Sequence, residues 1–166
     1  MNDKKLLAII IVVTLIILAG GVMVLGSNSS SSPQVRASKD AKAYTLEPTS
    51  FDWGNIQYAA EKATKTFTIK NTGKDTLKLF NIKTSCHCTI AKVTVDGKTS
   101  PDFGMSGISS WIGEVSPGKE AKLTVIFDQA FHGPQGVGPV TRFVSVETSD
   151  KDNGKITYTL TGTVVR

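Results

Sequence analysis

The sequence has few of the residues that build catalytic and metal centres, with only two cysteines and two histidines among 166 residues. It shows no carboxylate pair for acid–base chemistry, no nucleophile elbow and no phosphate-cradling loop. Ser109-Ser110 has no candidate base near it in sequence, and Gly136-Val137-Gly138 lacks the strand-to-helix context of a nucleotide loop. These absences predict a protein that is not an enzyme.

Clustered positive charge is also missing. Lys and Arg number 19 and Asp and Glu 14, for a net charge of +5, but the lysines between Lys62 and Lys92 are scattered. A nucleic-acid interface needs a basic stripe, and for single strands also stacking aromatics. The sequence therefore predicts no nucleic-acid partner.

A long apolar run near the start is the strongest positive signal. Residues 6–25 carry no charge, and Thr14 is their only polar side chain. Twenty residues of helix extend about 30 Å, enough to cross the hydrocarbon core of a bilayer. Lys4 and Lys5 precede the run, and basic residues favour the cytoplasmic side.

We therefore expect a cytoplasmic N-terminus at residues 1–5 and a transmembrane signal anchor at residues 6–26, through which the protein contacts the membrane. The predicted location is the cell membrane, with a single pass and the C-terminal domain outside the cytoplasm. A signal peptide cleaved after Gly26 is the alternative, although its apolar core would usually be only about 7–15 residues. A lipoprotein anchor is excluded because no cysteine follows the run.

Residues 27–41 are rich in serine, carry Pro33 and contain almost no large apolar side chain. Such a segment cannot bury enough surface to offset the entropy of ordering. We expect a flexible tether here and a folded domain at residues 42–166.

Short strands and turns fill the rest of the chain. Expected strands lie at residues 42–47, 50–53, 64–70, 76–83, 88–95, 121–128, 140–148 and 156–165. Asp96-Gly97 predicts a hairpin turn, and Gly73 predicts a turn with positive φ. The alternation breaks between Leu79 and Ile82, which predicts a bulge or burial on both faces of this strand. About seven strands and no soluble helix predict an all-β, immunoglobulin-like antiparallel sandwich. Its core must hold without an inter-sheet disulfide, because the two cysteines are too close in sequence to bridge the sheets.

The order of several short motifs resembles that of a bacterial family of exported immunoglobulin-like domains of unknown function. That family is similar in fold to the ASH and major-sperm-protein sandwiches. The motifs lie at Phe51–Ile56, Phe67–Gly73, Ser85–Thr89, Pro117–Lys119, Val125–Asp128 and Leu160–Val164.

The chain departs from the family pattern in three places. His87 stands where the family usually has glycine between the cysteines, and extra residues occur at about 96–116 and 131–138. The resemblance implies the fold and an envelope location, but no reaction.

The stretch Cys86-His87-Cys88 carries the candidate chemistry, and three interpretations compete. The cysteines could pack as small apolar side chains. They could instead form a disulfide, which needs a local turn because residues i and i+2 of a strand lie about 6.6–6.8 Å apart, at the upper limit for this bond. Such a disulfide could be structural or redox-active.

Metal binding is the third interpretation. Thiolates and an imidazole from Cys86, His87 and Cys88 suit copper(I), with Met105 or His132 as an added ligand. A structural zinc site is disfavoured because its cysteines are normally farther apart in sequence.

The sequence predicts a membrane-anchored, extracytoplasmic immunoglobulin-like binding or scaffold module without catalytic activity, which needs no cofactor. A protein partner would bind at an edge strand or at loops. The alternative is a copper(I)-binding or thiol-redox protein that acts through Cys86, His87 and Cys88.

Overall fold

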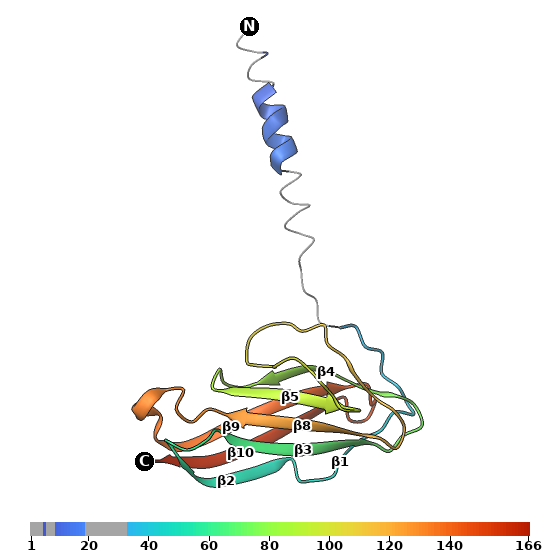
Figure 1. The fold of residues 1–166 in the computed structure, drawn as a ribbon. Coiled ribbons are helices and arrows are strands. Elements are labelled where there is room, and N and C mark those ends of the chain that lie inside the picture. The colour runs from blue at the N-terminus through green and yellow to red at the C-terminus, as the bar shows by residue number, and fades with distance from the viewer. Residues whose placement is uncertain (1–4, 6–8, 19–32) are drawn as a thin grey trace. The chain divides into compact units, whose positions relative to one another are not determined.

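The computed structural model describes residue 5, residues 9–18 and residues 33–166, which form two separate compact units (Figure 1). Residues 9–18 are helical. Within the described part of the chain, no helix has the length and hydrophobicity needed to span a bilayer. The predicted anchor at residues 6–26 and tether at residues 27–41 lie partly outside the described residues.

Two five-stranded sheets build the domain, which confirms the predicted β-sandwich but gives it ten strands instead of about seven. The first sheet has the order β1-β3-β8-β5-β6, with β1 at Ala43–Thr45, β3 at Ala63–Asn71, β8 at Glu120–Phe127, β5 at Thr89–Val95 and β6 at Lys98–Thr99. The second sheet has the order β2-β10-β9-β4-β7, with β2 at Ser50–Gln57, β10 at Lys155–Val165, β9 at Gly138–Thr148, β4 at Leu77–Thr84 and β7 at Gly113–Val115. Seven of these strands have seven residues or more.

One pairing departs from the predicted antiparallel arrangement, because β2 runs parallel to β10. The neighbouring strands β1 and β2 lie in different sheets, with β1 paired to β3. The chain therefore crosses between the sheets at residues 46–49. Alternation within a strand reveals its buried face but not its neighbour, so the sequence could not show this crossing.

The core lies between the two sheets and follows the expected period of two. Leu123, Val125 and Phe127 of β8 are buried, as are Tyr158 and Leu160 of β10. The Phe67 and Tyr158 rings meet across the sheets with centroids 4.4 Å apart. Apolar packing, rather than a bond between the sheets, stabilises the sandwich.

Two of the predicted local features are confirmed and one is wrong. Asp96 and Gly97 have φ angles of 47° and 77° in the turn between β5 and β6, and the β4–β9 register shifts between Phe80 and Lys83. Gly73 does not adopt positive φ. A side chain there would collide with the backbone of Asp40 and Lys42, so close approach explains this glycine.

Residues 38–41, predicted to belong to the tether, are part of the folded domain. The Ser38 amide donates to the Ser149 carbonyl at 2.7 Å, and Ala41 is fully buried. The apolar packing of one small residue was too weak a signal to set this boundary from the sequence.

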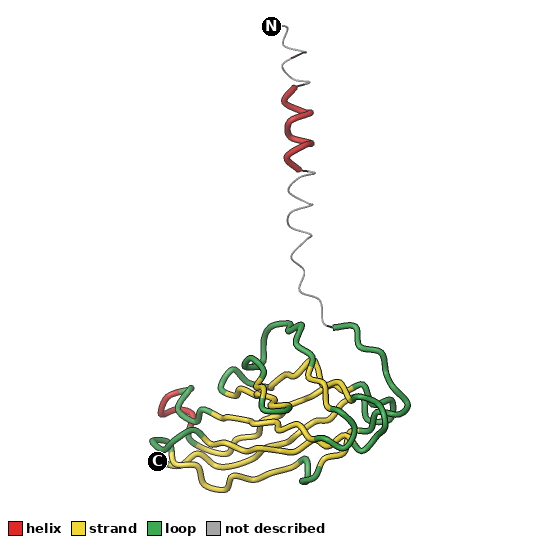
Figure 2. The backbone as a smooth tube through the Cα atoms, turned by 45° about the vertical axis from the view of Figure 1, so that its right-hand side comes forward, coloured by secondary structure: helices red, strands yellow, loops and turns green. Residues whose placement is uncertain are grey.

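Loops gather at the ends of the strands (Figure 2). Residues 85–88 connect β4 of the second sheet to β5 of the first, and residues 128–137 connect β8 of the first sheet to β9 of the second. The second loop contains the short 3-10 helix η1, Gly133–Gly136. These two crossings meet at one end of the sandwich and bring Cys86 and His132 together.

Candidate functional site: a disulfide between two sheet crossings

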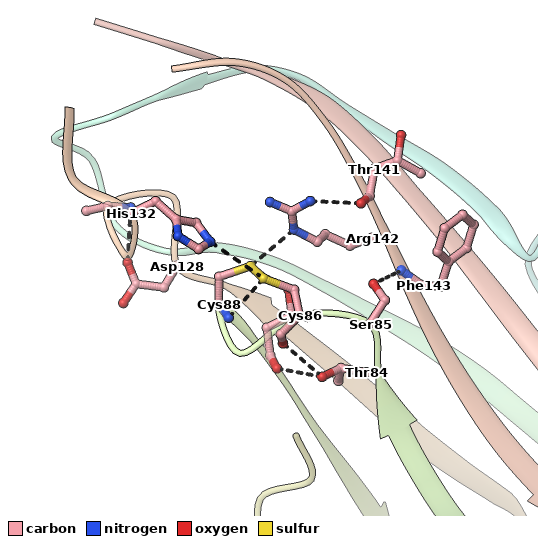
Figure 3. Close-up of a disulfide and its surroundings, with 11 residues drawn as sticks. Thr84, Ser85, Cys86, Cys88, Asp128, His132, Thr141, Arg142 and Phe143 are labelled. Carbon is pink, nitrogen blue, oxygen red and sulfur yellow. Dashed lines mark hydrogen bonds between the residues drawn. A yellow bond between two sulfur atoms is a disulfide. The ribbon is translucent and has the colours of Figure 1, made fainter. Parts of the chain in front are cut away.

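A tight turn at residues 85–88 carries both cysteines. The Thr89 amide donates to the Cys86 carbonyl at 3.1 Å, which brings the Cα atoms of Cys86 and Cys88 to 5.2 Å. Fully extended backbone would hold them about 6.6–6.8 Å apart. The two Sγ atoms form a disulfide in the structure (Figure 3).

Thr84 and Ser85, at the N-terminal end of the turn, hold it in place. The Thr84 hydroxyl lies 3.1 Å from the Cys86 carbonyl and 2.9 Å from the Thr89 carbonyl. The Ser85 amide donates to the Phe143 carbonyl, and the Ser85 hydroxyl accepts from the Phe143 amide, both at 2.9 Å. The turn is thereby attached to β9 of the second sheet.

The two sulfurs differ in burial. Cys88 is only 2% exposed and packs with Ile56, Phe127 and Val164. Cys86 is half-buried, and its Sγ accepts the Cys88 amide at 3.2 Å. Only the Cys86 side of the bond is therefore open to solvent to an appreciable degree.

Arg142 of β9 contacts the buried sulfur. Its Nε donates to Cys88 Sγ at 3.2 Å, and its Nη1 donates to the Thr141 carbonyl at 2.8 Å. Its guanidinium carbon lies 4.9 Å from the centre of the Phe127 ring. Burial lowers the pKa of Arg142, but an arginine keeps its charge in proteins. Among the described residues, no carboxylate lies within 4.0 Å of this cation.

His132 contacts the other sulfur from the loop at residues 128–137. Its Nε2 lies 3.7 Å from Cys86 Sγ, and its ring meets the Phe131 ring edge-on with centroids 5.1 Å apart. Asp128 supports the start of this loop by accepting the Ala130 amide at 3.1 Å and pairing with Lys62 at 2.8 Å. The Lys62 ammonium and backbone donors outweigh burial and hold the pKa of Asp128 below its usual value.

The structure brings together a different set of residues from the predicted triplet. Ligand atoms of Cys86, Cys88 and His132 lie within 4.8 Å of one another. His87 is exposed and lies outside this group, where it lines a shallow pocket of about 190 Å³ with Ile126 and Phe131. Met105 is 46% exposed on a neighbouring loop.

Arg142 was not predicted from the sequence as a site residue, although its position in the strand pattern indicated it. In β9 it shares the phase of Val144 and Val146, which are both fully buried. A charged residue at an inward-facing position of an alternating strand must be compensated by a polar or charged contact. Here that contact is made with the disulfide sulfur.

This arrangement supports two kinds of chemistry. A sulfur beside a fixed cation can leave as a thiolate in thiol–disulfide exchange. After reduction, two thiolates and an imidazole within 4.8 Å form a soft ligand set of the kind that copper(I) prefers.

The fold and the cysteine turn define an immunoglobulin-like sandwich with a disulfide at one end. Residues 44–101, which include both cysteines, match the family described as "Protein of unknown function (DUF1573)". The predicted resemblance to a family of unknown function is thus confirmed for this stretch. No curated protein matches the chain in sequence.

One solved structure supports the fold, and further ones are similar at lower scores. The chain is similar to a protein of unknown function from Porphyromonas gingivalis W83, with 16% identity and a TM-score of 0.58 over 79% of this chain and 50% of that chain. It therefore spans half the length of that protein. It is also similar to PapD-like domain 7 of human CEP192, with 15% identity and a TM-score of 0.48 over 84% of this chain and 96% of that domain. The Escherichia coli chaperone DraB gives 7% identity and a TM-score of 0.45 over 75% of this chain and 56% of that chain.

Proposed function

We propose that this chain is a membrane-anchored module that displays one immunoglobulin-like sandwich outside the cytoplasm and binds a protein partner there. The apolar residues 6–25, preceded by Lys4 and Lys5, support the anchor and its orientation. The domain itself supports the binding role, because the sheets present an edge that an extended peptide can join.

Strand β2 provides this edge, and its length is the observation that carries the proposal. The outermost strands are β1 and β6 in the first sheet and β2 and β7 in the second. Strand β2 has eight residues, whereas β1, β6 and β7 have three, two and three. A strand of eight residues offers enough backbone donors and acceptors for strand addition.

The hydrogen bonds on the inner side of β2 identify the groups that point away. The Tyr58 amide donates to the Val165 carbonyl at 2.7 Å. Alternate residues of a parallel ladder bond to the same neighbour, so Asn55 directs its backbone groups outward and Gln57 directs its N–H outward. The Gln57 carbonyl already accepts the Ala60 amide at 3.1 Å. Gly54, with a φ of 65°, interrupts the ladder and limits a partner to a short segment on either side.

A proline at position 57 tests this mode of binding. Peptides are selected from a random library against the full chain in detergent, and their affinities are compared for Gln57→Pro and Gln57→Thr. Proline removes only the outward N–H and is tolerated on edge strands. We expect about fivefold to tenfold weaker binding to Gln57→Pro, since one backbone hydrogen bond contributes roughly 1 kcal/mol. Equal affinities for the two variants would exclude strand addition at β2.

The contacts of Arg142 and His132 with the two sulfurs favour a second candidate, a thiol-redox or copper(I)-binding protein. Nε of Arg142 lies 3.2 Å from Cys88 Sγ, and Nε2 of His132 lies 3.7 Å from Cys86 Sγ. A disulfide with a purely structural role needs neither contact.

Three measurements on the full chain, purified without reductant, separate these chemistries. They are the intact mass, the number of titratable thiols and the content of copper and zinc. A mass lower by two hydrogens, with no thiols and no metal, establishes the disulfide and counts against the copper(I) site. Reactive thiols with about one bound copper support the copper(I) site. Two inert thiols without metal would eliminate the second candidate.

A further inference from the structure

The Cys86–Cys88 disulfide is asymmetric in every contact that matters for its chemistry. Cys88 is 2% exposed and lies against a cation, while Cys86 is half-buried and lies against an exposed histidine. We infer that the bond exchanges with a protein or peptide dithiol in one direction, with Cys86 as the sulfur attacked and Cys88 as the leaving group. This inference rests on the second candidate of the proposed function.

Burial decides which sulfur is attacked. An incoming thiolate must approach its target sulfur in line with the bond that breaks, from the side opposite the leaving sulfur. Cys88 packs with Ile56, Phe127 and Val164 and is only 2% exposed, so its sulfur is much less accessible to a thiolate than the sulfur of half-buried Cys86. Cys86 faces the exposed loop that carries His132, where a substrate can approach.

Charge decides which sulfur leaves. The better leaving group in disulfide exchange is the thiol whose thiolate is more stable. Nε of Arg142 already points at Cys88 Sγ at 3.2 Å, and no carboxylate of the described residues lies within 4.0 Å of this cation. The nearby carboxylate of Asp128 is paired with Lys62 at 2.8 Å. The guanidinium charge is therefore available to a thiolate on Cys88.

The exchange balances in two steps. A substrate thiolate forms a bond to Cys86 Sγ, and the Cys86–Cys88 bond breaks with its electron pair on Cys88. The second thiolate of the same substrate attacks the substrate sulfur of this mixed disulfide and expels Cys86 as a thiolate. Two electrons pass from the dithiol to the cysteine pair, and the two substrate protons go to the cysteine sulfurs or to solvent.

The first test locates the mixed disulfide. The full chain in detergent is treated with reduced glutathione, quenched with acid and alkylated with N-ethylmaleimide, and the tryptic peptide of residues 84–92 is sequenced by mass spectrometry. We expect glutathione on Cys86 and the alkyl group on Cys88. The reverse pattern, or equal amounts of both, would overturn the direction.

The second test measures the positioning role of Arg142. The redox equilibrium with dithiothreitol is determined for the unchanged chain and for the variants Arg142→Met, Arg142→Lys and Lys98→Met. The last variant removes one charge in β6, where Lys98 pairs with Val95 at the far end of β5. We expect about a tenfold loss of oxidising strength in Arg142→Met, or about 30 mV, and partial recovery in Arg142→Lys. Equal redox equilibrium constants for Arg142→Met and Lys98→Met would refute the role of Arg142.

A further measurement keeps the test valid if Arg142→Met folds poorly. In a Cys86→Ser chain, the pKa of the Cys88 thiol is read from its thiolate absorbance, with arginine and then lysine at position 142. We expect a higher thiol pKa with lysine, because only the guanidinium offers a fixed donor directed at the sulfur. An equal pKa of the Cys88 thiol with arginine and with lysine at position 142 would count against the role of Arg142 in stabilising the Cys88 thiolate. Failure of the unchanged chain to oxidise dithiothreitol at all would instead eliminate the thiol-redox form of the second candidate function.

Discussion

Asp150 joins the beginning of the domain to the loop between β9 and β10. Its carboxylate is buried and accepts the amides of Ala43 and Asp152, both at 2.9 Å, and Nδ2 of Asn153 at 3.3 Å. Burial alone would raise the pKa of Asp150, but these hydrogen bonds outweigh it and hold the pKa below the usual value. The charged carboxylate is therefore more stable in the folded chain than in the unfolded chain.

This depressed pKa predicts a loss of stability in acid. The contribution of Asp150 is fully present above the ordinary carboxyl pKa of about 3.9 and is lost as the pH falls through the lower, folded pKa. The free energy of unfolding should fall between neutral pH and about pH 3, and we expect a smaller fall in Asp150→Asn than in the unchanged chain. Urea denaturation at each pH measures this free energy. The control Asp152→Asn changes a carboxylate that is 67% exposed. If the free energy of unfolding depended on pH identically in the two variants, the lowered pKa of Asp150 would not explain the loss of stability in acid.

Gly73 is required by close packing. A Cβ atom at this position would lie 2.6 Å from the Lys42 amide nitrogen and nearer still to the Asp40 carbonyl oxygen. Because these are backbone atoms, Gly73→Ala should cost about 1–3 kcal/mol, as overpacking typically does. The matched control is Gly104→Ala, where a Cβ meets nothing within 4 Å. Similar urea midpoints for the two variants would show that this backbone moves freely.

At the scale of elements, the bulge in β4 lets one strand bury residues on both of its faces. Phe80 pairs with Glu147 and Lys83 with Ser145, so the ladder shifts between them, and Asn81 takes a φ of 48°. Leu79, Phe80 and Ile82 are all buried as a result. The sequence shows a break in alternation here because the bulge lets neighbouring residues on both faces of β4 be buried.

The positive φ of Asn81 predicts unequal effects of two substitutions on stability. Both Asn81→Gly and Asn81→Val remove the hydrogen bond to Glu147, so their difference reports on the backbone alone. We expect Asn81→Val to be less stable than Asn81→Gly by about 1–3 kcal/mol, because a β-branched residue resists positive φ. Thermal unfolding of both variants measures this difference. A valine variant as stable as the glycine variant would mean that the bulge can flatten.

At the scale of the whole molecule, the sandwich does not depend on its disulfide. The bond closes a loop with a sequence separation of only 2, so its entropic contribution is about 1–2 kcal/mol. The double variant Cys86→Ser/Cys88→Ser should fold and unfold cooperatively with that small loss, whereas Leu123→Ala should cost about 2–5 kcal/mol. Denaturant titrations test both values. Failure of the double variant to fold would show that the turn organises the end of the sandwich.

The orientation of the chain in the cell is the other prediction at this scale. Alkaline phosphatase fused after Arg166 should be active, because the enzyme folds only outside the cytoplasm and the predicted anchor carries Lys4 and Lys5 on its cytoplasmic side. The fusion should remain in the membrane fraction. Replacing both lysines with glutamate should lower the activity. An inactive fusion would reverse the proposed location, and an active fusion released from the membrane would indicate cleavage.

The sequence alone determined the class of the fold, most strand positions and the hairpin at Asp96-Gly97. These features depend on neighbours along the chain, where the period of two identifies a buried face and a turn residue ends it. Both cysteines of the site were found for the same reason, since they stand in one turn. Residues 38–41 were misassigned because their buried contacts are made with residues distant in sequence.

Only the tertiary structure decided the partners of the two sulfurs. His132 is 46 residues from Cys86, and Arg142 is 54 residues from Cys88. They meet because two crossings between the sheets occur at the same end, which alternation within single strands does not specify. The tertiary structure also placed His132, predicted as an added ligand, beside Cys86, and left His87 outside this group.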